Sequence, residues 1–163
     1  MFKKKLELVF IFIALSAILF MAKNYYDEYQ FKHNPIAQEL LDRIYDKERE
    51  ILTLMQQNYG YKVAFPIEVT DKIPSNLYGV TSSDSKGNIK ILLNKKRFKE
   101  SMDYIVESVL PHEYAHALIF KQGKYRGSDG HSKAWQESCV KLGGVGCAKY
   151  VNSNDVIMGK LPF

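Results

Sequence analysis

The sequence predicts an α+β fold preceded by a membrane-spanning helix. Apolar residues with helical spacing come first, short segments with strand-like alternation follow, and helical spacing returns toward the C-terminus. This order in a chain of 163 residues is typical of a small domain in which a short β-sheet packs on its helices. An apolar run ahead of these segments, broken only by Glu7 and Ser16, predicts the additional N-terminal helix.

The apolar run comprises residues 6–22 and follows a basic flank, residues 1–5, that holds three lysines. Its 17 residues would rise about 25 Å as a helix, the short end of what crosses a bilayer. A signal peptide also has a basic start and an apolar core, but the bulky Phe20 makes a poor cleavage end. We predict a membrane anchor at 6–22, with a signal peptide and a buried core helix as alternatives. The lysine bias predicts that the rest of the chain lies on the non-cytoplasmic side.

A juxtamembrane linker at residues 23–34 and a folded domain at residues 35–163 are expected next. Asn34 and Pro35 predict a helix start, with asparagine at the N-cap and proline in the first turn. Helical apolar spacing continues until Gly60, where we expect the helix to end. The residues that keep this spacing are Ile36, Leu40, Ile44, Ile51 and Met55.

Residues 61–69 alternate apolar and polar side chains and predict a strand, with Pro66 suited to a sheet edge. The segments LYGVT and NIKILLN flank the turn-forming SSDSKG and predict a hairpin or two neighbouring strands. Helical spacing returns from about Lys99 to Phe120, and again from His131 to Leu142.

The first of these two helices carries the sequence HEYAH, in which His112 and His116 lie four residues apart. Side chains at this spacing share one helix face, so two imidazoles can bind one ion. Zn²⁺ is the natural ion, because it accepts imidazole nitrogen and keeps a position for water in catalytic sites. Glu113 lies beside the ion, where its carboxylate can accept a proton from the attacking water.

The alternative is a pair of surface histidines, or buried histidines that bond to backbone groups. Two features favour a metal site. The face that carries the histidines is otherwise apolar, and His131 opens the last helix on its inward face. His131 is therefore the expected third ligand. Glu137 is the rival, although it lies off the face that carries His131.

The segments LPHEYAHALIF and GHSKAW resemble the SprT-like zinc metalloproteases, and GNIKILLN resembles the strand before their active-site helix. The resemblance covers most of residues 35–150. It implies a zincin-like domain that holds one Zn²⁺ per chain through His112, His116 and His131. It also implies Glu113 as general base and a protein or peptide as substrate. Ser132 stands where the family usually has glycine.

We therefore expect a membrane-anchored zinc metallopeptidase whose NIKILLN strand, at the sheet edge, pairs with an extended substrate. A cytosolic, DNA-associated SprT-like protein and an inactive protein with a structural zinc are the alternatives. The charge argues against a nucleic-acid partner: the chain carries +5, and without residues 1–22 there are 20 basic and 17 acidic side chains.

The two cysteines, Cys139 and Cys147, are too few for a disulfide scaffold. Outside the cytoplasm they can close a short disulfide, whereas inside they would be plain thiols. A remnant of a zinc ribbon is a third possibility.

Overall fold

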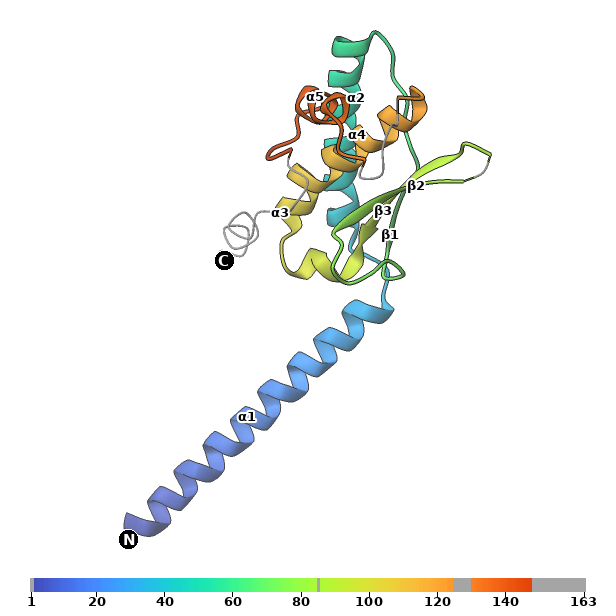
Figure 1. The fold of residues 1–163 in the computed structure, drawn as a ribbon. Coiled ribbons are helices and arrows are strands. Elements are labelled where there is room, and N and C mark those ends of the chain that lie inside the picture. The colour runs from blue at the N-terminus through green and yellow to red at the C-terminus, as the bar shows by residue number, and fades with distance from the viewer. Residues whose placement is uncertain (1, 85, 125–129, 148–163) are drawn as a thin grey trace. The chain divides into compact units, whose positions relative to one another are not determined.

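A computed structural model describes residues 2–84, 86–124 and 130–147 of the chain (Figure 1). The chain divides into two compact units, Met1–Ile36 and Ala37–Phe163. The second unit combines helices with a three-stranded sheet, which confirms the predicted α+β class.

The first unit is built on α1 (Phe2–His33), a helix of 32 residues. Its large apolar side chains between Leu6 and Met21 are 45–71% exposed. The helix is long and apolar enough to cross a membrane, and a signal sequence near an N-terminus shares that length and composition. It continues without a break through the predicted juxtamembrane segment as far as His33.

The second unit begins with α2 (Gln38–Tyr59), which buries the predicted apolar stripe from Leu40 to Met55 and ends at Gly60 as expected. The predicted start at Asn34 is wrong, because the helix begins after Ala37 and has no side-chain cap. The backbone N–H of Asn34 instead donates to the carbonyl of Gln30, 2.9 Å away, and so belongs to the end of α1. Pro35 follows and has no N–H with which to extend α1.

The sheet contains β1 (Ile67–Thr70), β2 (Gly79–Ser83) and β3 (Ile89–Asn94) in the order β1-β3-β2. The predicted hairpin is confirmed, since β2 and β3 pair antiparallel, while β1 pairs with β3 in parallel. The expectation that NIKILLN is the edge strand is wrong, because it forms β3 at the centre, and β1 and β2 occupy the two edges. Alternation defines the faces of a strand but not its neighbours, and the consecutive Ile91, Leu92 and Leu93 suit a central strand better.

The helix that carries HEYAH is less regular than predicted. Lys99 ends a 3₁₀ helix, η1 (Lys95–Lys99), and the longer helix starts only at α3 (Met102–Tyr104). It continues as a π-helical turn, η2 (Ile105–Val109), and then as α4 (Leu110–Lys121). Pro111 accounts for the wider turn, because its ring lacks an N–H and would clash with the carbonyl four residues back in a regular α-helix.

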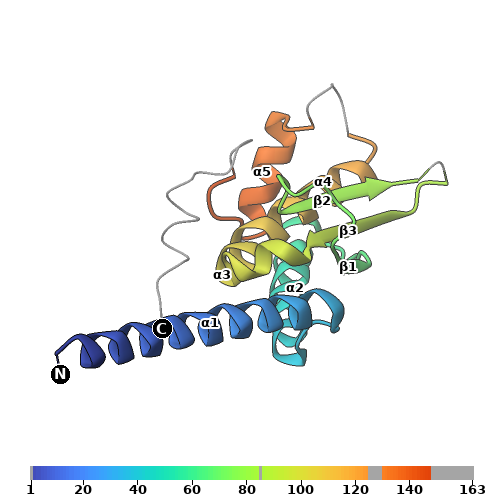
Figure 2. The same cartoon turned by 90° about the horizontal axis from the view of Figure 1, so that it is seen from below.

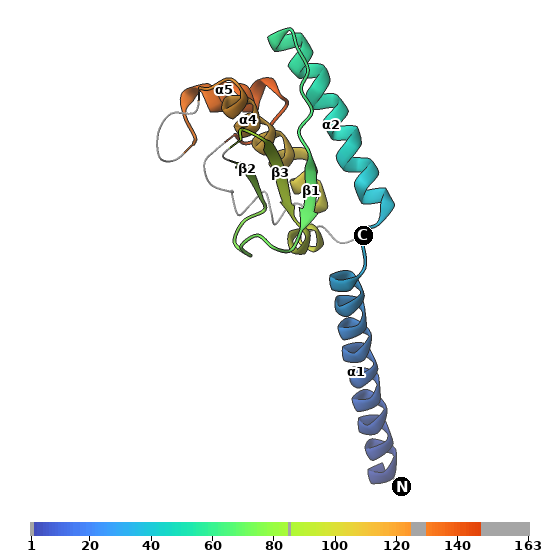
Figure 3. The ribbon, with the colours of Figure 1, turned by 90° about the vertical axis from the view of Figure 1, so that its right-hand side faces the viewer.

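The helix α4 lies between the sheet and α5 (Lys133–Lys141), in contact with both (Figure 1 and Figure 2). On another side it contacts α2 (Figure 3). Two polar contacts join α2 to the continuous helix that η2 and α4 form. The buried Lys47 ammonium lies 2.8 Å from the Glu107 carboxylate in η2, and the Tyr114 hydroxyl in α4 donates to Glu48. These contacts fix α4, and therefore its histidines, within the domain.

The last described helix, α5, starts two residues after His131, later than predicted. Ser132 is its N-cap, and the serine hydroxyl accepts a hydrogen bond from the Trp135 backbone N–H. Cys139 at the end of α5 is bonded to Cys147, which closes a loop with a sequence separation of 8. The two cysteines therefore form the disulfide that was one of the three possibilities.

Candidate metal centre

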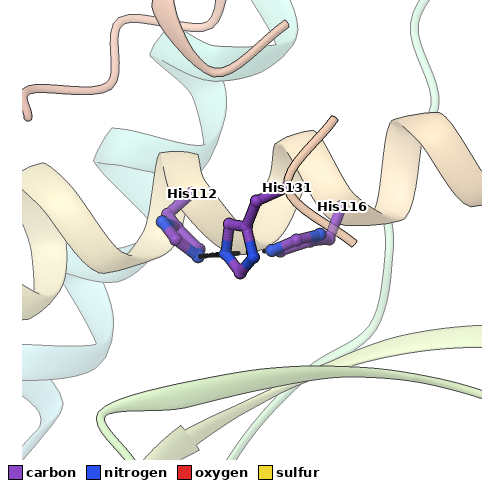
Figure 4. Close-up of side chains that lie close together, drawn as sticks. All are labelled: His112, His116 and His131. Carbon is purple, nitrogen blue, oxygen red and sulfur yellow. Dashed lines mark hydrogen bonds between the residues drawn. The ribbon is translucent and has the colours of Figure 1, made fainter. Parts of the chain in front are cut away.

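The helix α4 places His112 and His116 on one face, as the spacing of HEYAH predicts. Their Nε2 atoms lie 3.3 Å apart. The segment before α5 brings His131 to the same point, with its Nε2 3.4 Å from that of His112. Figure 4 shows the three rings turned toward one another, His131 coming from a different part of the chain. Their ligand atoms all lie within 4.8 Å of one another.

These distances fit a tetrahedral zinc ion. Zinc binds imidazole nitrogen at about 2.0–2.1 Å, and nitrogens at two corners of such a tetrahedron lie about 3.3–3.4 Å apart. The Nε2 atom of His112 lies 3.3 and 3.4 Å from those of His116 and His131, which matches this value. Three imidazoles leave a fourth position for water or substrate, as catalytic zinc sites do.

The protonation state of the rings also suits a metal. Burial, together with His131, lowers the pKa of His112 to about 4. Burial and the two neighbouring imidazoles lower the pKa of His116 to about 3. Both rings are therefore neutral at pH 7, which is the form of histidine that binds metal ions.

Trp135 packs against all three histidine rings. Its side chain is 1% exposed, and its ring centroid lies 4.7, 5.0 and 4.4 Å from those of His112, His116 and His131. Such packing limits the orientations that the imidazoles can adopt. The indole Nε1 is buried without a hydrogen-bond partner among the described residues.

Glu113 is next to the histidines and is 6% exposed. The hydroxyl of Thr81 on β2 lies 2.8 Å from both the Glu113 carbonyl oxygen and its carboxylate Oε2. Burial raises the pKa of Glu113 to about 7, and the hydrogen bond from Thr81 opposes part of that rise. A carboxyl group with a pKa near 7 can accept and release a proton at neutral pH, as a general base must.

Gly79 supplies the space that Glu113 occupies. A Cβ atom on Gly79 would lie 2.8 Å from Val109 Cγ1 and 3.0 Å from Glu113 Cγ, closer than carbon atoms normally approach. Sequence reasoning predicted the strand around LYGVT but not these roles of Gly79 and Thr81. Their partner lies 32 residues from Thr81 along the chain, and no local pattern marks such a contact.

Glu137, the rival third ligand, lies on the exposed side of α5. Among the described residues, the group of side chains able to hold a metal contains the three histidines and not Glu137. His131 is thus the candidate third ligand because of its place in the structure as well as its place in the sequence.

A cleft of about 350 Å³ opens beside the histidines. It is lined by β2 and the residues before it, by the inward side of η2 and α4, and by the disulfide-bonded loop after α5. The site thus combines a histidine pair on one helix, a third histidine and a buried glutamate beside a cleft. Hydrolases of the HExxH type are the class of protein with which this arrangement is compared.

The SprT-like family model matches residues 49–155, more than half of the chain, and this protein belongs to the SprT-like family. The matched range includes the HEYAH segment and His131. No curated protein and no solved structure matches the chain significantly. The family is generally zinc metalloprotease-like, so membership supports hydrolase chemistry at a coarse level.

Proposed function

We propose that this chain is a membrane-anchored zinc metalloendopeptidase. The observation that carries the proposal is the convergence of three imidazoles, two of them at separations from His112 that suit tetrahedral zinc, beside a buried glutamate with a pKa of about 7. When bound, zinc would acidify a water molecule and polarise the scissile carbonyl.

The side chains divide the remaining work. His112, His116 and His131 hold the ion. Glu113 accepts the proton of the attacking water at its carboxylate and then delivers it to the leaving amine nitrogen. Thr81 orients that carboxylate through Oε2, which leaves Oε1 for the water.

The edge strand β2 would hold the substrate. Among the described strands it pairs with β3 alone, and its residues Gly79, Val80 and Thr81 line the cleft. An extended peptide that pairs with the other edge of β2 would lie next to the histidines. Backbone pairing of this kind places little demand on the substrate sequence.

Anchoring rests on residues 6–22 within α1, and the orientation on the lysines of the basic flank. The disulfide supports the same orientation, because disulfides persist outside the cytoplasm and are rare within it. A membrane pellet resistant to high salt and alkali is the expected result of cell fractionation. Release by salt would favour the cytosolic, DNA-associated alternative.

The proposal is tested with the full-length chain purified in detergent micelles. The protein should hold close to one zinc per chain and cleave an unstructured peptide. A strong chelator should abolish cleavage, and added Zn²⁺ should restore it. Cleavage by a metal-free, folded preparation would disprove the proposal.

A further inference from the structure

The walls of the cleft differ from most of the protein surface in charge. The chain as a whole contains 23 Lys and Arg and 18 Asp and Glu residues. Among the described residues that line the cleft there is no lysine, arginine or aspartate, and Glu113 is the only glutamate. Outside the lining, Arg97 and Glu100 both contact the lining residue Tyr78, and the two are bonded to each other at 2.5 Å.

A charged side chain of a substrate would therefore lose water against described walls whose single carboxylate, that of Glu113, is the proposed base. Such desolvation is costly unless it is compensated by pairing. An apolar side chain would incur no such cost and would bury surface on the same walls.

Large apolar side chains are available on both sides of the histidines. Leu77, just before β2, is 37% exposed, and Val145, in the disulfide-bonded loop, is 69% exposed. Val80 and Phe120 are half-buried and also line the cleft. Exposed apolar surface beside reactive groups is typical of a ligand-binding site.

The disulfide holds the Val145 wall in place. Cys139 and Gly146 line the cleft together with Val145, and the bond to Cys147 closes the loop onto α5. The loop also packs tightly on the sulfur atoms: a Cβ atom on Gly144 would lie 2.5 Å from Cys139 Sγ. A wall fixed before the substrate arrives reduces the ordering that binding requires.

We propose that this cleft selects peptide segments with uncharged, apolar side chains around the scissile bond, and that Val145 is a specificity-determining residue. The inference rests on the proposed function, in that the ligand is taken to be a peptide. It adds the chemical class of that peptide and assigns a role to the disulfide-bonded loop.

The test uses fluorescein-labelled peptides that differ at the two positions flanking the scissile bond, Val-Leu in one and Lys-Lys or Asp-Asp in the others. Binding is measured by anisotropy on the zinc-loaded Glu113→Gln variant of the full-length chain in micelles. The Val-Leu peptide should bind about ten- to a hundredfold more tightly, the gain expected from burying one or two aliphatic side chains. Equal binding of the three peptides would overturn the inference.

A second variant tests the contribution of the disulfide-bonded loop without interference from partition of the peptides into the micelles. In the Glu113→Gln background, Val145→Asp should lower affinity for the Val-Leu peptide about tenfold and raise it for the Lys-Lys peptide. Val145→Ile is the matched control and should preserve the preference. Unchanged binding by the Val145→Asp variant, with its zinc content and melting temperature intact, would exclude a role for Val145.

These measurements do not depend on turnover. The wild-type chain could cleave none of the peptides while the Glu113→Gln variant still binds the Val-Leu peptide selectively. That result would disprove the peptidase function and support the selectivity of the cleft for apolar side chains. Equal cleavage of all three peptides by the wild-type chain, together with equal binding, would support the peptidase function and disprove the selectivity.

Discussion

At the scale of single residues, one hydroxyl connects the sheet to the proposed base. Thr81 lies 2.8 Å from Glu113 Oε2, and Glu113 is buried. Hydrogen bonds to charged groups contribute about 1.5–3 kcal/mol. Thr81→Val keeps the shape of the side chain but removes this bond, so kcat should fall about ten- to a hundredfold while zinc content stays constant.

Thr81→Ser is the matched control, since it retains the hydroxyl and should restore most of the rate. The pH profile provides a second measurement. The hydrogen bond lowers the pKa of Glu113, so the pKa of Glu113 in the Val variant should rise and the acid limb of kcat should move to higher pH. A Val variant with the wild-type rate and profile would show that Thr81 does not orient the base.

Gly79 makes a second residue-scale prediction. Gly79→Ala would introduce a Cβ atom 2.8 Å from Val109 Cγ1 and 3.0 Å from Glu113 Cγ. Overpacking of this kind costs about 1–3 kcal/mol, and relief of the clash would displace the Glu113 side chain. We expect a lower melting temperature and slower peptide cleavage together. Gly87→Ala is a useful comparison for stability, because a Cβ atom there meets nothing within 4 Å, although its positive φ adds strain.

At the scale of the elements, the start of α5 positions the third histidine. The Ser132 hydroxyl caps this helix directly after His131. Ser132→Ala should lower the free energy of unfolding by about 1 kcal/mol, whereas Ser132→Gly should cost only a few tenths. Urea unfolding of the two variants tests this order. A larger loss in the glycine variant would mean that the cap is not what stabilises the segment.

The helices and the hairpin were predictable because each depends on local spacing. The four-residue separation in HEYAH places His112 and His116 on one face whatever the tertiary structure. The order of the strands was not predictable, because β1 reaches β3 through a parallel pairing that no turn signal marks. The π-helical turn before Pro111 was also missed, since a helical apolar pattern does not distinguish the two kinds of turn.

The candidate site, too, was predictable only where local spacing determines which residues share a face. Residue type and periodicity predict the three histidines and Glu113 as site residues, and the geometry of its helix disfavours Glu137 as a ligand. The contact of Thr81 with Glu113 joins a strand to a helix, so it appears only when the sheet is packed on α4. The roles of His131 as ligand and Glu113 as base remain predictions that mutation must test.

At the scale of the whole molecule, the disulfide and the proposed orientation support each other. Alkaline phosphatase fused after Phe163 should be active in a bacterial host, because the lysines at residues 3–5 favour a cytoplasmic N-terminus. An inactive fusion that is nevertheless expressed would reverse the orientation. It would also make the bond between Cys139 and Cys147 inconsistent with the compartment of the domain.

Loss of the disulfide should measurably lower the stability of the fold. The cysteines lie 8 positions apart in the sequence, and closing a loop of this length stabilises a fold by about 2–3 kcal/mol because it restricts the unfolded chain. Cys147→Ser should therefore lower the melting temperature, and a reducing agent should lower it in the wild-type protein but not in the variant. Equal sensitivity of both proteins to the reducing agent would contradict this assignment.

The central claim is that the histidines bind the metal while Glu113 transfers the proton. The most direct test measures zinc content and peptide hydrolysis together on the Glu113→Gln variant and the wild-type chain. The amide keeps the shape of the side chain and leaves the three histidines in place. Zinc should stay near one per chain while hydrolysis falls by about 10²–10⁴, the usual contribution of a general base. His131→Ala is the comparison, because it should lose zinc and hydrolysis together. Full hydrolysis by the Glu113→Gln variant would show that Glu113 is not the base.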